Sequence, residues 1–246
     1  PVLGVLDAGG FTPEEAASLD APECAGDLYL KPDGGGQGVG IALWPAGDPR
    51  GLLERSRRAP PPAPLLVQPR IRGHPDLAPV SNGHVCSLRI TTYLGPGGGV
   101  EHVLPALKMA AGEAFVDNFS RGNLAAPVDP ATGRLGRPWS YDARKVPAPR
   151  EAHPDTGAPI AGREVPLFRE AVDLCRRAHA SFEGLFACGW DVAATAGGPV
   201  LIEGNRIFGV ILPQLVWDTP LGETAYPAAL RAALEGRAGR IGAPGA

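Results

Sequence analysis

The chain has 246 residues, of which 44% are hydrophobic and 20% charged, which is the composition of an ordinary globular protein. A net charge of −3 gives no electrostatic reason to expect nucleic acid or an anionic membrane as a partner. No apolar run approaches the roughly 20 residues that a membrane-spanning helix needs, so we expect no membrane partner of that kind.

The cysteines and the N-terminus predict a cytoplasmic protein. Four cysteines lie far apart without a Cys-x-x-Cys pair, which favours free and mostly buried thiols. No basic segment followed by an apolar one marks a secretory signal. The chain starts at Pro1 instead of Met, so a fragment whose true start is missing stays an alternative. The oligomeric state has no signal in the sequence.

The N-terminal part predicts short strands around a glycine-rich loop. Thr12 followed by Pro13 is typical of a helix start, and the run LYLKPDGGGQGVGIALW is typical of a β-hairpin with a long glycine-rich tip. The expected elements are a helix at 12–19, strands at 28–31 and 39–44, a short helix within 51–64 and a strand at 65–68.

The remainder predicts more strands than helices. Residues 84–94 alternate well, and the apolar residues of 165–182 fit one face of a helix. No βαβ alternation is visible, so we expect an α+β protein with antiparallel strands. The expected elements are strands at 84–94, 100–111 and 124–128, an irregular stretch at 129–164, a helix at 165–182, a strand pair at 186–195 and 199–203, and a helix at 225–240.

A lysine and a group of glycines indicate a phosphate site. Lys31 ends a predicted strand, and the loop after it contains Gly34, Gly35, Gly36 and Gly38. Glycines let backbone N–H groups approach phosphate oxygens, and the ammonium group adds a positive charge. The loop matches neither a Walker A sequence nor a Gly-x-Gly-x-x-Gly that opens a helix. An ordinary flexible hairpin tip is the alternative.

Three oxygen-bearing side chains lie on the last predicted strand pair. Asp191 is on one strand, and Glu203 and Asn205 are at positions i and i+2 of the next, beyond a tight Gly-Gly-Pro turn. Residues i and i+2 point to one face of a strand. Carboxylate and amide oxygens suit Mg²⁺, so we interpret this set as a metal site. A polar sheet face with a turn cap is the alternative.

Two cations lie on neighbouring predicted strands. If the strands pair, Arg89 and Lys108 would face one cleft and balance phosphate charge; a solvated sheet face is the alternative. No Ser-His-Asp arrangement is visible. Substrate contacts are expected in the irregular loops. The candidates there are Asp117, Asn118, Ser120, Arg121 and His153.

Taken together, the order and spacing of these blocks resemble the ATP-grasp superfamily, in particular its sugar-transfer-associated branch, which is related to α-L-glutamate ligase homologues. The matching blocks extend from Leu28 to Asn205. They are LYLKPDGGGQGVGI, LLVQPRIRGHPDL, SLRITTY, VDNFSRGN, HPDTG and GWDVAATAGGPVLIEGN.

The resemblance implies an ATP-grasp fold of class α+β, with two lobes of mainly antiparallel sheet and helices and the nucleotide held between them. We expect an N-terminal lobe at 1–66 and a C-terminal lobe at 67–246. Lys31 would hold the α- and β-phosphates under the glycine loop, and Asp76 would contact the ribose. The hinge at which adenine packs would consist of Val67, Gln68 and Ile71.

The resemblance further implies ATP and Mg²⁺ as cofactors. Arg89 and Lys108 would be the catalytic cations at the γ-phosphate, although related sequences often have Arg where this chain has Lys108. The metal ligands would be Asp191, Glu203 and Asn205.

The implied activity is an ATP- and Mg²⁺-dependent ligase that joins a small-molecule carboxylate to an amine through an acyl phosphate. The family name places it near polysaccharide biosynthesis. A small-molecule kinase, a non-catalytic nucleotide-binding module and a domain without a ligand are the alternatives. Family members usually have a preceding domain and a further lysine upstream of Lys31, but only 27 residues precede Leu28 here and none is lysine. Either the chain is truncated or its site works with fewer cations.

Overall fold

The computed structural model describes the protein at residues 4–7, 12, 26–33, 40–46, 48–59, 61–112, 119 and 122–241. The chain divides into two compact units, Pro1–Ile71 and Arg72–Ala246. The helix expected at 12–19 lies outside the described residues except for Thr12. The lobe division at 66 and 67 falls inside strand β4 (Leu65–Pro69) and stays a prediction.

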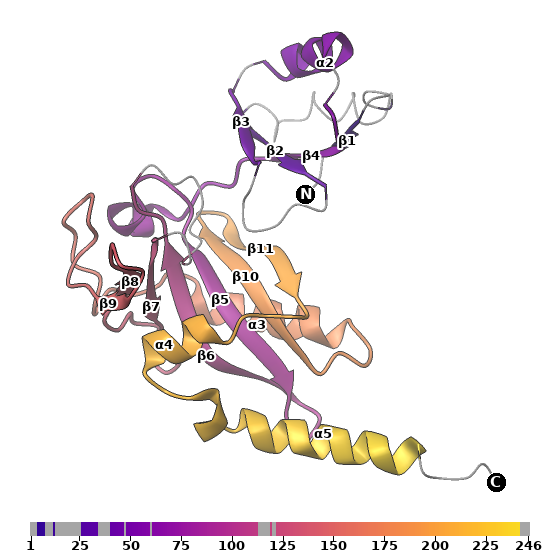
Figure 1. The fold of residues 1–246 in the computed structure, drawn as a ribbon, viewed down its shortest axis with the longest axis vertical. Coiled ribbons are helices and arrows are strands. Elements are labelled where there is room, and N and C mark those ends of the chain that lie inside the picture. The colour runs from indigo at the N-terminus through magenta and orange to yellow at the C-terminus, as the bar shows by residue number, and fades with distance from the viewer. Residues whose placement is uncertain are drawn as a thin grey trace. The chain divides into compact units, whose positions relative to one another are not determined.

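The first unit is a small antiparallel sheet with a helix against it (Figure 1). Helix α2 (Pro49–Arg58) begins at the N-cap Asp48, whose carboxylate accepts a hydrogen bond from the backbone N–H of Gly51 at 2.8 Å. The buried core of the described part consists of Leu6, Leu28, Leu30, Leu52 and Val67. The strand order is β1 (Gly4–Leu6), β4, β2 (Leu28–Pro32) and β3 (Ala42–Trp44).

The second unit is built on a seven-stranded sheet. Every strand pair in its described part is antiparallel, which agrees with the expected α+β class. The strand order is β11 (Gly198–Asn205), β10 (Ala187–Thr195), β5 (Ser87–Leu94), β6 (Val100–Met109), β7 (Leu124–Pro127), β8 (Trp139–Tyr141) and β9 (Pro147–Pro149).

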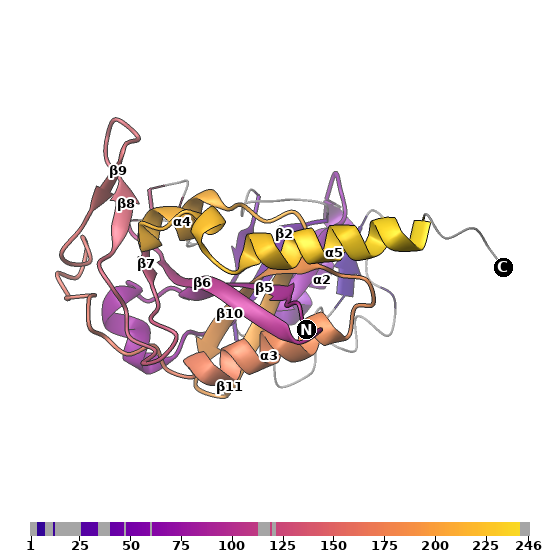
Figure 2. The ribbon, with the colours of Figure 1, turned by 90° about the horizontal axis from the view of Figure 1, so that it is seen from below.

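Helices cover both faces of this sheet (Figure 2). Helix α3 (Phe168–Ala180) packs on one face, where the main hydrophobic core lies. Helices α4 (Ile211–Trp217) and α5 (Tyr226–Ile241) lie on the other face, the latter after the short 3₁₀ helix η4 (Leu221–Glu223). The 3₁₀ helix η2 (Pro75–Val80) precedes β5.

Two expectations about these elements need correction. Residues 129–164 were expected to be irregular but contain β8 and β9, which are too short for alternation to reveal. Phe182 was expected on the buried face of its helix, but α3 ends at Ala180 and Phe182 is 59% exposed. The residues that α3 buries are Phe168, Ala171, Val172, Cys175 and His179.

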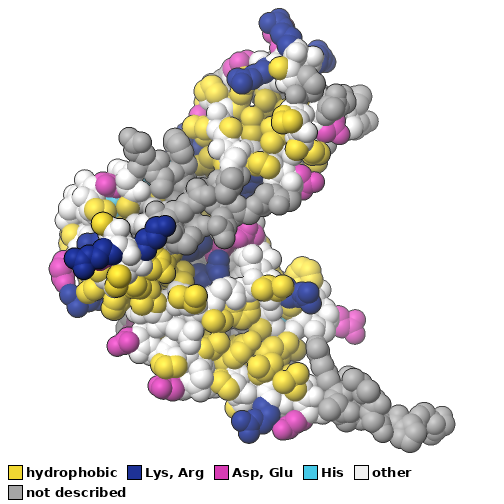
Figure 3. Space-filling view, viewed as in Figure 1, with side chains coloured by type: hydrophobic (Ala, Val, Ile, Leu, Met, Phe, Trp, Pro, Cys, Tyr) yellow, Lys and Arg dark blue, Asp and Glu magenta, His cyan; other side chains and the backbone are white. Residues whose placement is uncertain are grey.

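Other observations bear on partners. Cys86, Cys175 and Cys188 are free and buried, as expected for the three cysteines that the structure describes. Within the described ranges, no helix is long and apolar enough to cross a membrane. On the face shown in Figure 3, the Lys and Arg side chains of the described residues are interspersed with Asp and Glu side chains. That face therefore offers no one-sign surface of the kind that attracts nucleic acid.

Candidate functional site

Four neighbouring strands of the second unit each place one charged side chain in the same region of the sheet. Asp191 on β10 lies opposite Arg89 on β5 and opposite Glu203 on β11. Lys108 on β6 lies opposite Ser87, one diagonal step from Arg89. Residues that are directly opposite one another in antiparallel strands share a face, so these side chains lie on one face of the sheet. It is the face that helix α4 covers further along, at Ala106 and Val216.

A β-bulge turns Glu203 to this face. The pairing that starts with Thr195 opposite Gly198 shifts by one residue between Asp191 and Val192, so that Ile202 is the extra residue. Uninterrupted pairing would place Ile202 opposite Asp191. Glu203 would then be opposite Trp190, whose side chain is buried in the core beneath α3.

A second bulge, on β6, turns Lys108 to the same face. The register of β5 and β6 shifts between Arg89 and Thr91, and Leu104 on the bulged strand has a positive φ of 46°. Without the shift, Lys108 would share a face with the core residue Leu88. Helix α4 holds the bulge, because the indole N–H of Trp217 donates to the carbonyl of Pro105 at 2.8 Å.

Asp191 is the buried centre of the charged residues. Its Oδ1 accepts from Nε of Arg89 at 2.7 Å, and its Oδ2 accepts from Nη2 of Arg89 at 3.0 Å. Nζ of Lys108 lies 3.2 Å from the same Oδ2. Asp191 is 5% exposed and Lys108 is 8% exposed, so both charges need these partners. Burial alone would raise the pKa of the Asp191 carboxyl, but Lys108 and Arg89 outweigh it and the pKa is lowered.

Glu203 and Asn205 form an exposed pair beside this centre. Nδ2 of Asn205 donates to Oε1 of Glu203 at 3.0 Å, which leaves the amide oxygen of Asn205 for a ligand. Within the described ranges, no three His, Cys, Asp or Glu side chains are grouped closely enough to hold a metal ion. A Mg²⁺ site would therefore need the Asn205 amide, and the set of Asp191, Glu203 and Asn205 has the hard oxygen donors that Mg²⁺ prefers.

Gly189 keeps space in front of the charged residues, a feature that the sequence analysis missed. It lies opposite Asn205, and a Cβ atom there would be 2.6 Å from Cβ of Phe208 and 3.6 Å from Cδ of Arg89. Its only signal in the sequence is a glycine inside a strand pattern, which is typical of a close approach by another group.

The expected nucleotide residues of the first unit lie on two neighbouring strands. Lys31 lies opposite Leu66, and Gln68 lies opposite Tyr29, so Lys31 and Gln68 share a face. The side chain of Val67 is on the other face and is fully buried in the core. An adenine contact by that side chain would need the core to open, so only the Val67 backbone is suited to the expected role.

Other expected residues have different surroundings. Ile71 ends the first unit and is half-buried. The carboxylate of Asp76 in η2 is 73% exposed and lies 3.6 Å from Nδ1 of His74. The following candidates lie outside the described residues, so their roles stay predictions: Gly34, Gly35, Gly36, Gly38, Asp117, Asn118, Ser120 and Arg121.

His153 is 1% exposed and binds backbone groups at both ring nitrogens. Nε2 lies 2.8 Å from the carbonyl of Ala110, and Nδ1 accepts from the N–H of Asp155 at 3.3 Å. Asn123 and Asp155 also bind the chain after β6, at the N–H groups of Ala111 and Gly112. These contacts give His153 a structural task, and a contact with substrate stays a prediction. The other two residues were not among our candidates, although both follow short turn-like sequences.

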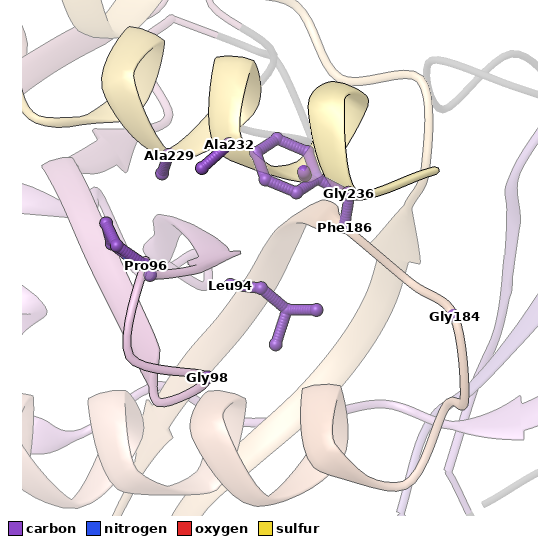
Figure 4. A pocket seen from close by; sticks show the side chains of 10 residues that line it. Leu94, Pro96, Gly98, Gly184, Phe186, Ala229, Ala232 and Gly236 are labelled. Atoms are coloured by element: carbon purple, nitrogen blue, oxygen red, sulfur yellow. The ribbon is translucent and has the colours of Figure 1, made fainter. Parts of the chain in front are cut away.

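A hollow of about 540 Å³ lies elsewhere in the second unit, between α5 and the β5–β6 turn (Figure 4). None of the described residues that line it is charged, and it includes none of the charged residues above. It therefore lacks the polar groups that orient a small ligand. Its lining residues include Leu94, Pro96, Phe186, Ala229 and Ala232.

Comparison with protein-family models matches residues 56–226 to the family described as sugar-transfer associated ATP-grasp. The chain belongs to this family. The matched part of this ATP-grasp chain includes all five residues of the charged region, from Arg89 to Asn205, and it does not include Lys31. Comparison with curated proteins finds no match.

Solved structures agree with an ATP-grasp fold. The ADP complex of N5-carboxyaminoimidazole ribonucleotide synthetase has a TM-score of 0.51 at 12% identity, covering 93% of this chain and 45% of the other. The N5-carboxyaminoimidazole synthase from Aspergillus clavatus has 0.49 at 14% identity, covering 96% and 47%. The D-alanine–D-alanine ligase from Bacillus anthracis has 0.43 at 15% identity, covering 94% and 59%. The chain thus spans about half the length of these proteins.

Proposed function

We propose that this ATP-grasp chain uses ATP and Mg²⁺ to join a small-molecule carboxylate to an amine. The observation that supports the proposal most is the set of four charged side chains that β11, β10, β5 and β6 bring to one face of the sheet. Two of these side chains are cations suited to phosphate, and two are carboxylates suited to a divalent metal ion.

The proposed reaction has two balanced steps. A carboxylate oxygen of the first substrate attacks the γ-phosphorus of ATP, and the bond to the bridging oxygen breaks with its electron pair leaving on ADP. The amine then attacks the acyl carbon of the acyl phosphate, loses a proton, and displaces inorganic phosphate. The products are an amide, ADP and phosphate, and no nucleophilic side chain of the protein is needed.

The residues of the site would have distinct tasks. Arg89 and Lys108 would bind the transferred phosphoryl group and stabilise the charge that develops on its oxygens. Asp191, Glu203 and Asn205 would hold Mg²⁺, which neutralises phosphate charge when it is bound. Lys31 and the glycine loop would hold the other phosphates, and residues of the 117–121 loop would bind the substrates.

Thermal melts with and without ligands test this proposal. ATP with Mg²⁺ should raise the melting temperature, because a ligand that binds only the folded state at about 100 times its Kd adds about 2.7 kcal/mol to the free energy of unfolding. Glu203→Gln should abolish the rise. Glu235→Gln, at an exposed position of α5, is the matched control and should keep it.

Product analysis then distinguishes the activities. Release of both ADP and phosphate with carboxylate and amine pairs would support the ligase, whereas phosphate retained on an acceptor would indicate a kinase. A melting temperature that neither ATP nor ATP with Mg²⁺ changes in the parent protein would contradict nucleotide binding altogether.

A further inference from the structure

The ion pairs of Asp191 leave little of its carboxylate for any other ligand. Arg89 occupies one position on each oxygen, and Lys108 occupies a second position on Oδ2. Each carboxylate oxygen accepts about two hydrogen bonds, so three of about four acceptor positions are used. The two cations already compensate the one negative charge, and all three groups are largely withdrawn from water.

This arrangement disfavours a divalent cation and favours an anion. Arg89 and Lys108 would repel Mg²⁺ at short range, where the surrounding protein screens charge less than water does. A polyphosphate would instead be attracted to the two cations and compete with Asp191 for them. The competition would release acceptor positions on Asp191 at the time when phosphate charge is present.

We propose that Asp191 is the counter-ion that positions Arg89 and Lys108 while no nucleotide is bound, and that it exchanges them for Mg²⁺ when a polyphosphate binds both cations. Binding of Mg²⁺ at this site is therefore conditional on the nucleotide. The inference rests on the nucleotide site proposed above, and it gives Asp191 a positioning role in addition to that of a metal ligand.

Glu203 provides the matched comparison. It faces the same side of the sheet from the next strand, but its side chain is exposed and its described hydrogen bond is to neutral Asn205. It has no described ion pair with a cation to give up. Removing the Glu203 charge should therefore weaken metal binding without making the two cations more available to phosphate.

The first test measures ATP binding by calorimetry with EDTA or with Mg²⁺ present. The parent protein should bind ATP much more tightly with Mg²⁺. Asp191→Asn should bind ATP in EDTA about tenfold more tightly than the parent, because one competing charge a few ångströms from the phosphate is gone. It should also lose most of the gain from Mg²⁺. Glu203→Gln should lose the gain from Mg²⁺ and show little increase in EDTA.

The second test covers the case in which Asp191→Asn does not fold. Lys108→Gln removes one of the cations that compensate Asp191. It should bind Mn²⁺, a spectroscopic substitute for Mg²⁺, several-fold more tightly than the parent in the absence of nucleotide. Water-proton relaxation measures this without any turnover, and Glu203→Gln should not show the increase.

Particular outcomes would overturn the inference. One is that Asp191→Asn folds and binds ATP in EDTA no better than the parent, which would make Asp191 only a structural partner of the cations. Another is nucleotide-free Mn²⁺ binding that is equal in the parent and in Lys108→Gln. If the parent binds ATP under neither condition, the proposed function itself fails, and the two failures are thereby distinguished.

Discussion

At the scale of single residues, the candidate site depends on a position without a side chain. Gly189 is two residues before Asp191 on β10, so its α-carbon faces the same side of the sheet. Phe208 approaches it from the chain after β11, and Arg89 passes beside it to reach Asp191. Phe208 and the guanidinium group can both lie close to the strand because nothing projects from Gly189.

We expect Gly189→Ala to destabilise the protein by about 1–3 kcal/mol, the range for inserting a methyl group into a packed site. The new methyl would lie 2.6 Å from Cβ of Phe208, so Phe208 must move. Adding Phe208→Ala should restore part of the loss. Urea unfolding of the single and double variants measures this coupling.

Gly197→Ala is the control for that experiment. Gly197 is in the β10–β11 turn, its φ is not positive, and the nearest atom to an added Cβ is Oγ1 of Thr195 at 3.8 Å. It should be nearly neutral. Equal losses at Gly189 and Gly197, or additive effects of the Gly189 and Phe208 changes, would contradict the close approach that we describe.

At the scale of elements, a buried chain of hydrogen bonds joins α3 to β5 and β10. The indole N–H of Trp190 donates to Oγ1 of Thr92 at 2.7 Å, and the same oxygen lies 2.7 Å from Nδ1 of His179. Nε2 of His179 lies 3.0 Å from the carbonyl of Leu185 and must donate to it. Nδ1 is then the acceptor for the Thr92 hydroxyl, so this chain of bonds needs a neutral imidazole.

The pKa of His179 predicts how stability depends on pH. Burial lowers it below 6.5, and the Leu185 carbonyl offsets only part of the effect. Between those two values the unfolded chain binds a proton that the folded protein does not. The free energy of unfolding should therefore fall as the pH falls below about 6.5, by up to about 1.4 kcal/mol per pH unit.

In His179→Gln this part of the slope should be absent. Urea unfolding at several pH values between 7.5 and 5 measures it in both proteins. The pKa of His102 is also lowered, by burial and by Arg176, but His102 is present in both proteins and its contribution cancels. Identical slopes would show that His179 does not titrate as we describe.

The strands themselves were largely visible in the sequence, because alternation and turn residues determine where β5, β10 and β11 begin and end. Their register was not. We expected Asp191 and Glu203 on one face, but plain alternation from the turn would have put them on opposite faces. Bulges depend on packing across the sheet, here on Trp217 and on the core beneath α3, and local sequence does not encode that packing.

At the scale of the whole molecule, the two units have cores of very different size. The core of the first unit consists of five buried side chains in the described residues, whereas the main core of the second has 21. Buried apolar area is the main source of stability, so a small core on a separate sheet favours opening before the rest unfolds. The charged residues that we assign to phosphate and metal all lie in the larger unit.

Hydrogen exchange should show this difference. We expect the amide groups of β2 and β4 to exchange through openings of lower free energy than those of β5 and β10. Mass spectrometry of peptic peptides measures both sets in one experiment. Equal protection in the two sheets would mean that the units unfold together, and would contradict the inference from core size.

The bulge on β11 has a consequence for how such chains can vary in length. The strand contains one residue more than its pairing with β10 requires. Loss of a residue between the turn and Glu203 could be absorbed by regular pairing, and Glu203 would still lie opposite Asp191. Gain of a residue would demand a wider bulge or would turn Glu203 toward the core. This strand thus has slack in one direction, so deletions and insertions at the same place have opposite meanings for the site.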